Sequence, residues 1–281
     1  MTTPTPTSTQ PEPTQPETTQ PETAQPETTT ANNPRDEPPQ YVLPLVVRME
    51  REHPPQRTDA LETAARAVLT FLSDPRVTEP DGEWAAVVEA WTDGRIRKVV
   101  RRARGGEWRR AELLAGITVT GTATAPTTVT TTASGTTAGT AASPAAEVRV
   151  YPPVPIDAWP KYLAKLQVSG TELEDAEPPA PLDADTAADL PVLWLSPELE
   201  MSAGKSMAQV GHAAQIAWWE LDEAQRKEWA ATGFRLAVRT ASREKWPALC
   251  ASGRPVVRDA GFTEIAPGSH TVVADLPVLN H

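Results

Sequence analysis

Apolar and polar positions along residues 40–168 follow the pattern of short strands separated by helices. The nearly continuous apolar run at 41–48 predicts a buried strand. Apolar side chains then recur at helical spacing through 60–72, which predicts a helix with one buried face. The same reasoning predicts a short helix at 83–92, a basic strand leading into a helix at 94–108, strands at 117–119 and 148–151, and a short helix at 157–166.

A second series of elements begins at residue 192 and follows the same order. The pattern predicts strands at 192–195, 234–239, 255–258 and 271–274, with helices from 202, at 222–230 and at 242–251. Trp108 aligns with Trp246 at an offset of 246 minus 108, or 138 positions. The alignment predicts two copies of one α/β unit, of which the first has lost its site. The alternative is that any two α/β units align loosely.

Composition separates these series from segments that have few apolar side chains. Residues 1–39 repeat Thr-Gln-Pro-Glu-Thr, and 121–146 is rich in Thr, Ala, Gly and Ser. Neither segment buries enough apolar surface to offset its ordering entropy, so we predict disorder in both. The predicted domains are a tail at 1–39, a degenerate unit at 40–168 with its insertion at 121–146, an acidic linker at 169–189, and a second unit at 190–281.

Charge and cysteine content bear on location and partners. The chain has 281 residues, a net charge of −11 and one cysteine. A single thiol excludes an internal disulfide and suggests a reducing compartment. The chain has neither an apolar run of membrane-spanning length nor a signal-peptide pattern at its start. We therefore predict a cytoplasmic protein without a membrane partner.

A dense basic run stands out in this acidic chain. We predict that it binds a nucleic-acid backbone through phosphate contacts, with Arg95, Arg97, Lys98, Arg101 and Arg102 as the contact residues. The alternative is a solvated surface whose charge the acidic linker balances.

The candidate chemistry begins where the strand at 192–195 gives way to a helix. Ser202 is placed to cap that helix, and Lys205 puts a cation where free N–H groups already favour an anion. Lys205, Gln209 and His212 recur at i, i+4 and i+7, so they share one face. Taken singly, each has a plain explanation: a solvated lysine, a surface glutamine, a packing histidine.

Two longer segments carry a resemblance. The first is Met201-Ser-Ala-Gly-Lys-Ser-Met-Ala-Gln-Val-Gly-His-Ala-Ala214, and the second is Arg258-Asp-Ala-Gly-Phe-Thr-Glu-Ile-Ala-Pro-Gly-Ser269. In this order and spacing they resemble the type II peptidyl-tRNA hydrolase family over about 190–277. The resemblance implies an α/β fold with a mixed four-stranded sheet and helices on both faces. It implies hydrolysis of the ester of peptidyl-tRNA, with tRNA as partner and no metal or other cofactor.

The family's functional positions carry over residue by residue. The resemblance implies catalytic roles for Lys205, Asp259 and Thr263. It implies substrate binding by Gly204, Gln209, His212, Pro267, Gly268 and Ser269. Phe262 and Glu264 depart from the family's usual arginine and glutamine, which favours an alternative: a catalytically weak module that binds tRNA or protein. Family members are often dimers, so we expect either an intrachain pseudo-dimer or a homodimer.

Overall fold

The computed structural model describes residues 1, 39–122, 143–182, 189–261 and 265–277. The predicted N-terminal tail and most of the predicted Thr-rich insertion lie outside the described residues. The described residues from 39 onward form one compact unit that contains all the helices and strands named below. Within the described residues, no helix is both long and apolar enough to cross a membrane.

The first half of this unit contains β1 (Tyr41–Arg48), α1 (Arg57–Leu72), α2 (Pro75–Thr78), α3 (Ala85–Asp93), β2 (Arg97–Ala103), α4 (Gly106–Ala111), β3 (Ile117–Thr120), β4 (Glu147–Val150), β5 (Val154–Pro155) and α5 (Lys161–Lys165). The second half contains β6 (Val192–Leu195), α7 (Ala203–Glu220), α8 (Glu223–Ala231), β7 (Ala237–Thr240), α9 (Trp246–Ala251), β8 (Val256–Arg258) and β9 (His270–Asp275). The predicted alternation of strands and helices is confirmed.

The two halves have the same sheet topology. One sheet has the order β2-β1-β4-β3, with the short β5 paired to β1, and the other has the order β7-β6-β9-β8. In each sheet the first two strands of the order are parallel, and the remaining neighbours are antiparallel. This confirms a mixed α/β fold with a repeated unit.

Small details repeat as well. The indole Nε1 of Trp91 donates to the Arg97 carbonyl at 3.0 Å, and that of Trp229 donates to the Arg235 carbonyl at 3.0 Å. The offset is 229 minus 91, or 138 positions, which is also the offset between the buried Trp108 and Trp246. The structure therefore repeats at the offset that the sequence pattern indicated.

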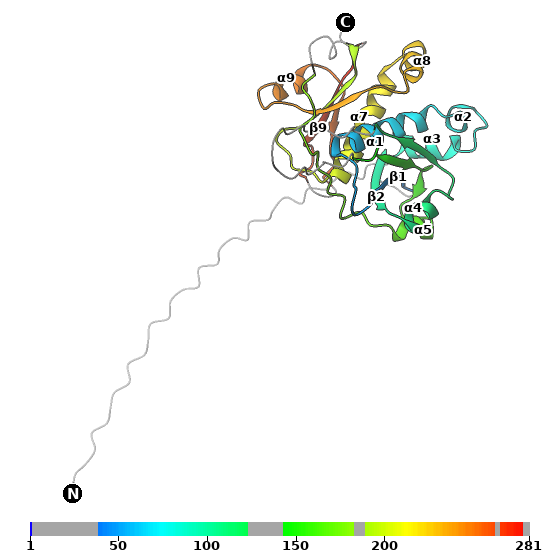
Figure 1. Cartoon of the computed structure of the whole chain (residues 1–281), viewed down its shortest axis with the longest axis horizontal. Coiled ribbons are helices and arrows are strands. Elements are labelled where there is room, and N and C mark those ends of the chain that lie inside the picture. The colour runs from blue at the N-terminus through cyan, green and yellow to red at the C-terminus, as the bar shows by residue number, and fades with distance from the viewer. Residues whose placement is uncertain (2–38, 123–142, 183–188, 262–264, 278–281) are drawn as a thin grey trace, which may run out of the picture. The chain divides into compact units, whose positions relative to one another are not determined.

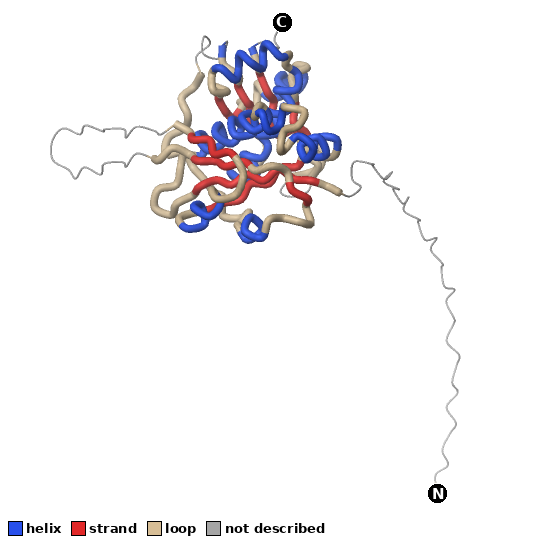
Figure 2. Tube along the Cα trace, turned by 90° about the vertical axis from the view of Figure 1, so that its right-hand side faces the viewer, coloured by secondary structure: helices blue, strands red, loops and turns tan. Residues whose placement is uncertain are grey.

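The helices α1 and α7 pack against each other between the two sheets (Figures 1 and 2). α1 contacts β3 and β4 of its own sheet and β7 of the other, while α7 contacts β6, β8 and β9 of its own sheet and β2 of the other. A Cβ added at Gly211 of α7 would lie 3.1 Å from a methyl group of Val68 in α1. This close approach explains the glycine, and one apolar cluster runs through both halves.

Smaller clusters cover the outer faces of the sheets. Trp108, Tyr151 and Leu163 lie buried with α4 and α5 on the first sheet. Trp246, Leu249 and Val273 lie buried with α9 on the second sheet. Both central strands, β1 and β6, are thereby covered on both faces, which is why they read as continuous apolar runs.

The strand β7 begins at Ala237, three positions after the start of the predicted strand. Gly233 and Phe234 adopt positive φ angles of 69° and 57°, which end α8 and delay the strand. A positive φ is unfavourable for phenylalanine, but its ring packs edge-on against Trp218 and Trp229 at centroid distances of 5.7 and 6.0 Å. Burial of this aromatic cluster offsets the backbone strain.

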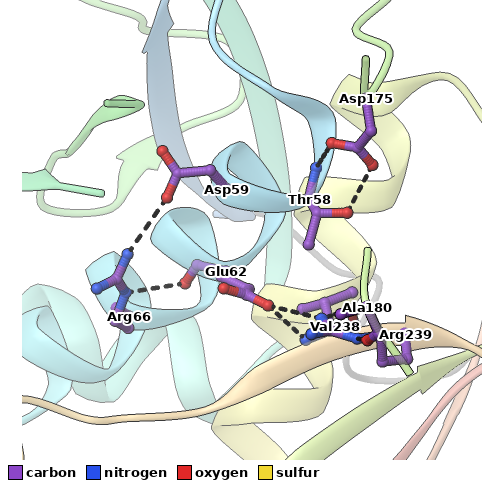
Figure 3. A network of polar contacts seen from close by, with 8 residues as sticks. All are labelled: Thr58, Asp59, Glu62, Arg66, Asp175, Ala180, Val238 and Arg239. Carbon is purple, nitrogen blue, oxygen red and sulfur yellow. Dashed lines mark hydrogen bonds and ion pairs between the residues drawn. The ribbon is translucent and has the colours of Figure 1, made fainter. Parts of the chain in front are cut away.

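The described part of the predicted linker, 169–182, lies against the start of α1. Asp175 accepts hydrogen bonds from the backbone N–H of Thr58 at 2.8 Å and from its hydroxyl at 2.6 Å (Figure 3). A carboxylate at this place satisfies a free N–H of the helix and interacts favourably with its dipole. The segment is therefore held to the folded unit by specific contacts.

Candidate active site

The site is built on the first turn of α7. The hydroxyl of Ser202 accepts from the backbone N–H of Lys205 at 3.2 Å, so Ser202 caps the helix as predicted. Gly204 lies under the linker, where its N–H donates to the Thr171 hydroxyl at 3.2 Å. A Cβ at Gly204 would lie 2.5 Å from that hydroxyl oxygen. The glycine therefore lets the linker close directly over the helix start.

The structure brings Lys205 and Asp259 into direct contact. Lys205 Nζ lies 2.5 Å from Asp259 Oδ2, and the two side chains are only 13% and 7% exposed. Gln209 Nε2 donates to the same oxygen at 2.8 Å. Three residues from the two motif segments thus converge, although 54 positions separate Lys205 from Asp259. Such a partly buried pair interacts more strongly than an exposed one.

The loop after β8 holds the aspartate from the other side. Gly261 N–H donates to Asp259 Oδ1 at 2.7 Å, and Gly268 N–H donates to the Asp259 carbonyl at 2.7 Å. Gly261 has a φ of 77°, and a Cβ there would lie 2.4 Å from the ring of Pro267. Pro267 and Gly268 are exposed, while Ser269 is half-buried and accepts from the Asp259 N–H. Thr263, with Phe262 and Glu264, lies outside the described residues.

Thr271 of β9 completes the cluster, and the sequence reasoning missed it. Its hydroxyl donates to Gln209 Oε1 at 2.6 Å, and the residue is fully buried. This bond fixes which end of the Gln209 amide faces Asp259. A buried threonine in a strand gives no periodic signal that separates it from a packing residue, so only the fold reveals the contact.

His212 lies on the same helix but faces a different partner. Its Nδ1 lies 3.2 Å from the ammonium of Lys98 in β2, which also donates to Gln215 Oε1 and, at 3.4 Å, to the Ile96 carbonyl. Burial lowers the pKa of Lys98 well below its usual value. Burial, together with the charges of Lys98 and Lys205, holds the pKa of His212 well below its usual value. The structure therefore brings Gln209, and not His212, to the carboxylate.

The predicted nucleic-acid contacts have partners within the molecule. Lys98 is only 8% exposed. Arg101 donates to the carbonyls of Ala164 and Leu166, and Arg102 donates to the Ser169 carbonyl at 2.9 Å. Arg95 and Arg97 are half-buried, and Arg97 donates to Gln40. A role for these side chains in nucleic-acid binding stays a prediction.

The corresponding place in the first half has a different chemistry. Asp59 follows the α1 cap Gln56 by as many positions as Lys205 follows Ser202. Gly121 follows β3 directly, as Asp259 follows β8. The Asp59 carboxylate accepts from the backbone N–H groups of Thr122 at 2.8 Å and Ala146 at 2.7 Å. A structural carboxylate thus replaces the lysine–aspartate pair.

The contact of Lys205 with Asp259 in the second half is an arrangement suited to a hydrolytic site. A cation at a helix start, held beside a carboxylate that an amide and a backbone N–H orient, is suited to hydrolysis with an aspartate as base. Among the described residues, no group of three or more His, Cys, Asp or Glu side chains is placed to hold a metal ion.

Comparison with known proteins agrees with a hydrolytic site. The family model described as Peptidyl-tRNA hydrolase PTH2 matches residues 191–280. The protein named "Peptidyl-tRNA hydrolase 2, mitochondrial" of Homo sapiens is 31% identical over 121 residues, covering 40% of this chain and 67% of the relative. The protein named "Peptidyl-tRNA hydrolase" of Haloquadratum walsbyi is 37% identical over 84 residues, covering 27% of this chain and 75% of the relative. The chain belongs to the PTH2 family of peptidyl-tRNA hydrolases.

Proposed function

We propose that this protein hydrolyses the ester bond that joins a peptide to tRNA, releasing free peptide and tRNA. The observation that carries this proposal is the contact of Lys205 and Asp259 at 2.5 Å, held by Gln209, in a chain of the PTH2 family. Both named relatives are peptidyl-tRNA hydrolases.

Asp259 is the residue that orients and activates the attacking water. An ionised carboxylate has roughly four acceptor positions. At Asp259, Oδ2 accepts from Lys205 and Gln209, and Oδ1 accepts from Gly261 N–H. The remaining position of Oδ1 is where a water can donate and pass its proton as it attacks the ester carbon. An ester is a reactive substrate, so modest activation of water suffices.

Lys205 stabilises the negative charge that develops on the carbonyl oxygen. The lysine lies in the first turn of α7, where free N–H groups add to the positive potential. A cation fixed by its neighbours needs little rearrangement as the charge forms. The same group can also meet a phosphate at the 3′ end of tRNA.

The remaining predicted site residues have supporting roles in this proposal. Thr263 gives hydrogen-bonding support to the attacking water, and Gly204, Pro267, Gly268 and Ser269 form walls that receive the tRNA 3′ end. Arg95, Arg97, Arg101 and Arg102 contact the tRNA backbone further away. The pairing of α1 with α7 supports an intrachain pseudo-dimer, and the lone Cys250 supports a cytoplasmic location.

The test is release of peptide from a labelled N-acyl-aminoacyl-tRNA. We expect turnover by the wild type and at least a hundredfold lower kcat/KM in Lys205→Ala and Asp259→Asn, the order of loss typical of an electrostatic or acid–base group. Lys227→Ala and Asp81→Asn are matched controls, because both residues are exposed. Circular dichroism verifies that each variant is folded.

The outcomes separate this function from the alternative binding module. Wild-type turnover that survives Lys205→Ala and Asp259→Asn would contradict the proposed site. Absence of turnover, with salt-sensitive tRNA binding that Arg101→Ala and Arg102→Ala remove, would identify a binding module instead. Turnover of a simple acyl ester in preference to the tRNA ester would identify another hydrolase.

A further inference from the structure

Lys98 of the first half makes polar contacts with α7 of the second half. This lysine lies on β2, and its ammonium is within hydrogen-bonding distance of three acceptors: His212 Nδ1, Gln215 Oε1 and the Ile96 carbonyl. It also lies over the ring of Trp91 at 4.9 Å from the centroid. Burial lowers the pKa of Lys98, but three acceptors match the three N–H donors of an ammonium and so favour the charged form.

The fold itself does not need a lysine at this place. The offset that relates Trp91 to Trp229 also relates Lys98 to Leu236, which is buried at the equivalent position of the second half. The helix caps Gln56 and Ser202 are 146 positions apart (202 minus 56). At the same offset, the α1 position equivalent to Gln215 of α7 is Leu69. Burial of a lysine is costly, whereas leucine is suited to such a position. The two equivalent positions are both leucines, so the lysine–glutamine contact is not repeated between the second half and α1.

We propose that Lys98 is a positioning residue of the hydrolytic site: by donating to Nδ1, it holds His212 uncharged with its proton on Nε2. This inference rests on the function proposed above. His212 lies on the α7 face that carries Lys205 and Gln209, and its side chain is only partly buried. The Nε2–H is then a constant donor, suited to a phosphate or carbonyl oxygen of the substrate.

The charge of His212 affects Asp259, because the histidine lies on the same helix face as Lys205 and Gln209, which contact that carboxylate. The charged groups that act on its ring are Lys98 from β2 and Lys205 from its own helix. From α1, Arg57 contacts α7 at Ser206, and from the β8–β9 loop, Asp259 contacts it through Lys205 and Gln209. A second cation on this face would stabilise the ionised form of Asp259 and so weaken it as a base. Burial disfavours a proton on the ring, and Lys98 adds to this by disfavouring a proton on Nδ1.

The test replaces Lys98 with the leucine that the chain has at the equivalent position. In the wild type we expect the pKa of His212 to lie below its ordinary value, because the ring is buried and two cations act on it. Lys98→Leu removes one of these cations and keeps the burial, so we expect the pKa of His212 to rise in this variant. NMR of the histidine ring protons measures this directly, and His212→Asn assigns the signal. As pH falls, the kcat/KM of Lys98→Leu should then begin to decrease at a higher pH than that of the wild type, because the neutral fraction of His212 decreases earlier. Adding His212→Asn removes that dependence.

Controls separate this role from simple packing. Arg102→Leu changes a charged residue of the same strand that bonds to Ser169 and Gln167, and we expect no change in the titration of His212. Lys98→Met keeps the long apolar stem and serves if Lys98→Leu does not fold. An ordinary titration of His212 in the wild type would overturn the inference, as would a loss of activity in Lys98→Leu that is equal at every pH.

The NMR titration also distinguishes this inference from the proposed function. A wild type without peptidyl-tRNA hydrolysis would refute the function alone, because the ring signals report the state of His212 without any substrate. A hydrolase whose His212 titrates identically with and without Lys98 would keep the function and refute the inference.

Discussion

Gln209 holds Asp259 only while its own amide keeps one orientation, and the Thr271 hydroxyl supplies that constraint at 2.6 Å. In Thr271→Val the shape of the side chain is kept but the amide oxygen loses its donor. We expect kcat/KM to fall about tenfold and the free energy of unfolding to fall by about 1–3 kcal/mol, the cost of an unsatisfied buried acceptor. Hydrolysis assays and urea titration measure the two effects.

Thr240→Val is the matched control for this change, because Thr240 is an exposed threonine at the end of β7. We expect its stability to stay within about 0.5 kcal/mol of the wild type. Equal activity of Thr271→Val and Thr240→Val would show that Gln209 does not depend on Thr271.

At the scale of elements, the linker and α7 are fitted to each other at Gly204. Alanine there is the better helix residue, but its Cβ would lie 2.5 Å from the Thr171 hydroxyl. We expect Gly204→Ala to lower the free energy of unfolding by about 1–3 kcal/mol through overpacking. Removing the hydroxyl in Gly204→Ala/Thr171→Ala relieves the contact and recovers most of the loss, so a double-mutant cycle measures the coupling. Additive losses would contradict the fit.

The edge strand β7 is covered by a carboxylate from α1, Glu62. It accepts from the Val238 N–H at 3.0 Å and from Arg239 at 3.1 Å (Figure 3). Burial raises the pKa of Glu62 above its ordinary value, and these contacts oppose the rise. The folded state therefore holds this proton more tightly than the unfolded chain does.

The sign of the pH dependence follows from that raised pKa. As pH rises from about 4.5, the unfolded chain releases the proton first, so the contribution of Glu62 to stability decreases. We expect Glu62→Gln to gain stability relative to the wild type between pH 4.5 and pH 7. Urea titrations of both proteins across this range measure the difference. A difference that shrinks with rising pH would mean that the Arg239 pair outweighs burial.

Most elements were predictable because their signals are local. The apolar run 41–48 and the helical spacing at 60–72 correspond to β1 and α1. The strand β5 and the helix α2 were missed, because two and four residues are too short to show a period. The approach of Lys98 to His212 was also beyond prediction, since it depends on how the two halves pack and 114 positions separate the residues.

At the scale of the whole molecule, α1 and α7 share one apolar cluster, so neither half has a core of its own on that side. We expect the compact unit to unfold in one cooperative transition. Leu61→Ala, in α1, removes a fully buried side chain and should cost about 2–5 kcal/mol. The thermal midpoint of Leu61→Ala should fall by the same amount whether it is measured by calorimetry or by the loss of hydrolysis on heating. This is a test of cooperativity, because Leu61 lies in the half without the lysine–aspartate pair.

Val168→Ala is the control for this prediction, because Val168 is 51% exposed. Two separate calorimetric transitions in Leu61→Ala, with hydrolysis following only the later one, would show that the halves fold independently.

The contact of Asp59 with the loop after β3 limits how a lysine–aspartate pair could arise in the first half. A Cβ at Gly121 would lie 2.3 Å from the Asp59 carboxylate, so an aspartate introduced there first would collide with a like charge. A lysine introduced first at 59 would leave the N–H groups of Thr122 and Ala146 without their acceptor. Each single substitution is unfavourable, so a stepwise path to a second site in this molecule crosses an evolutionary barrier.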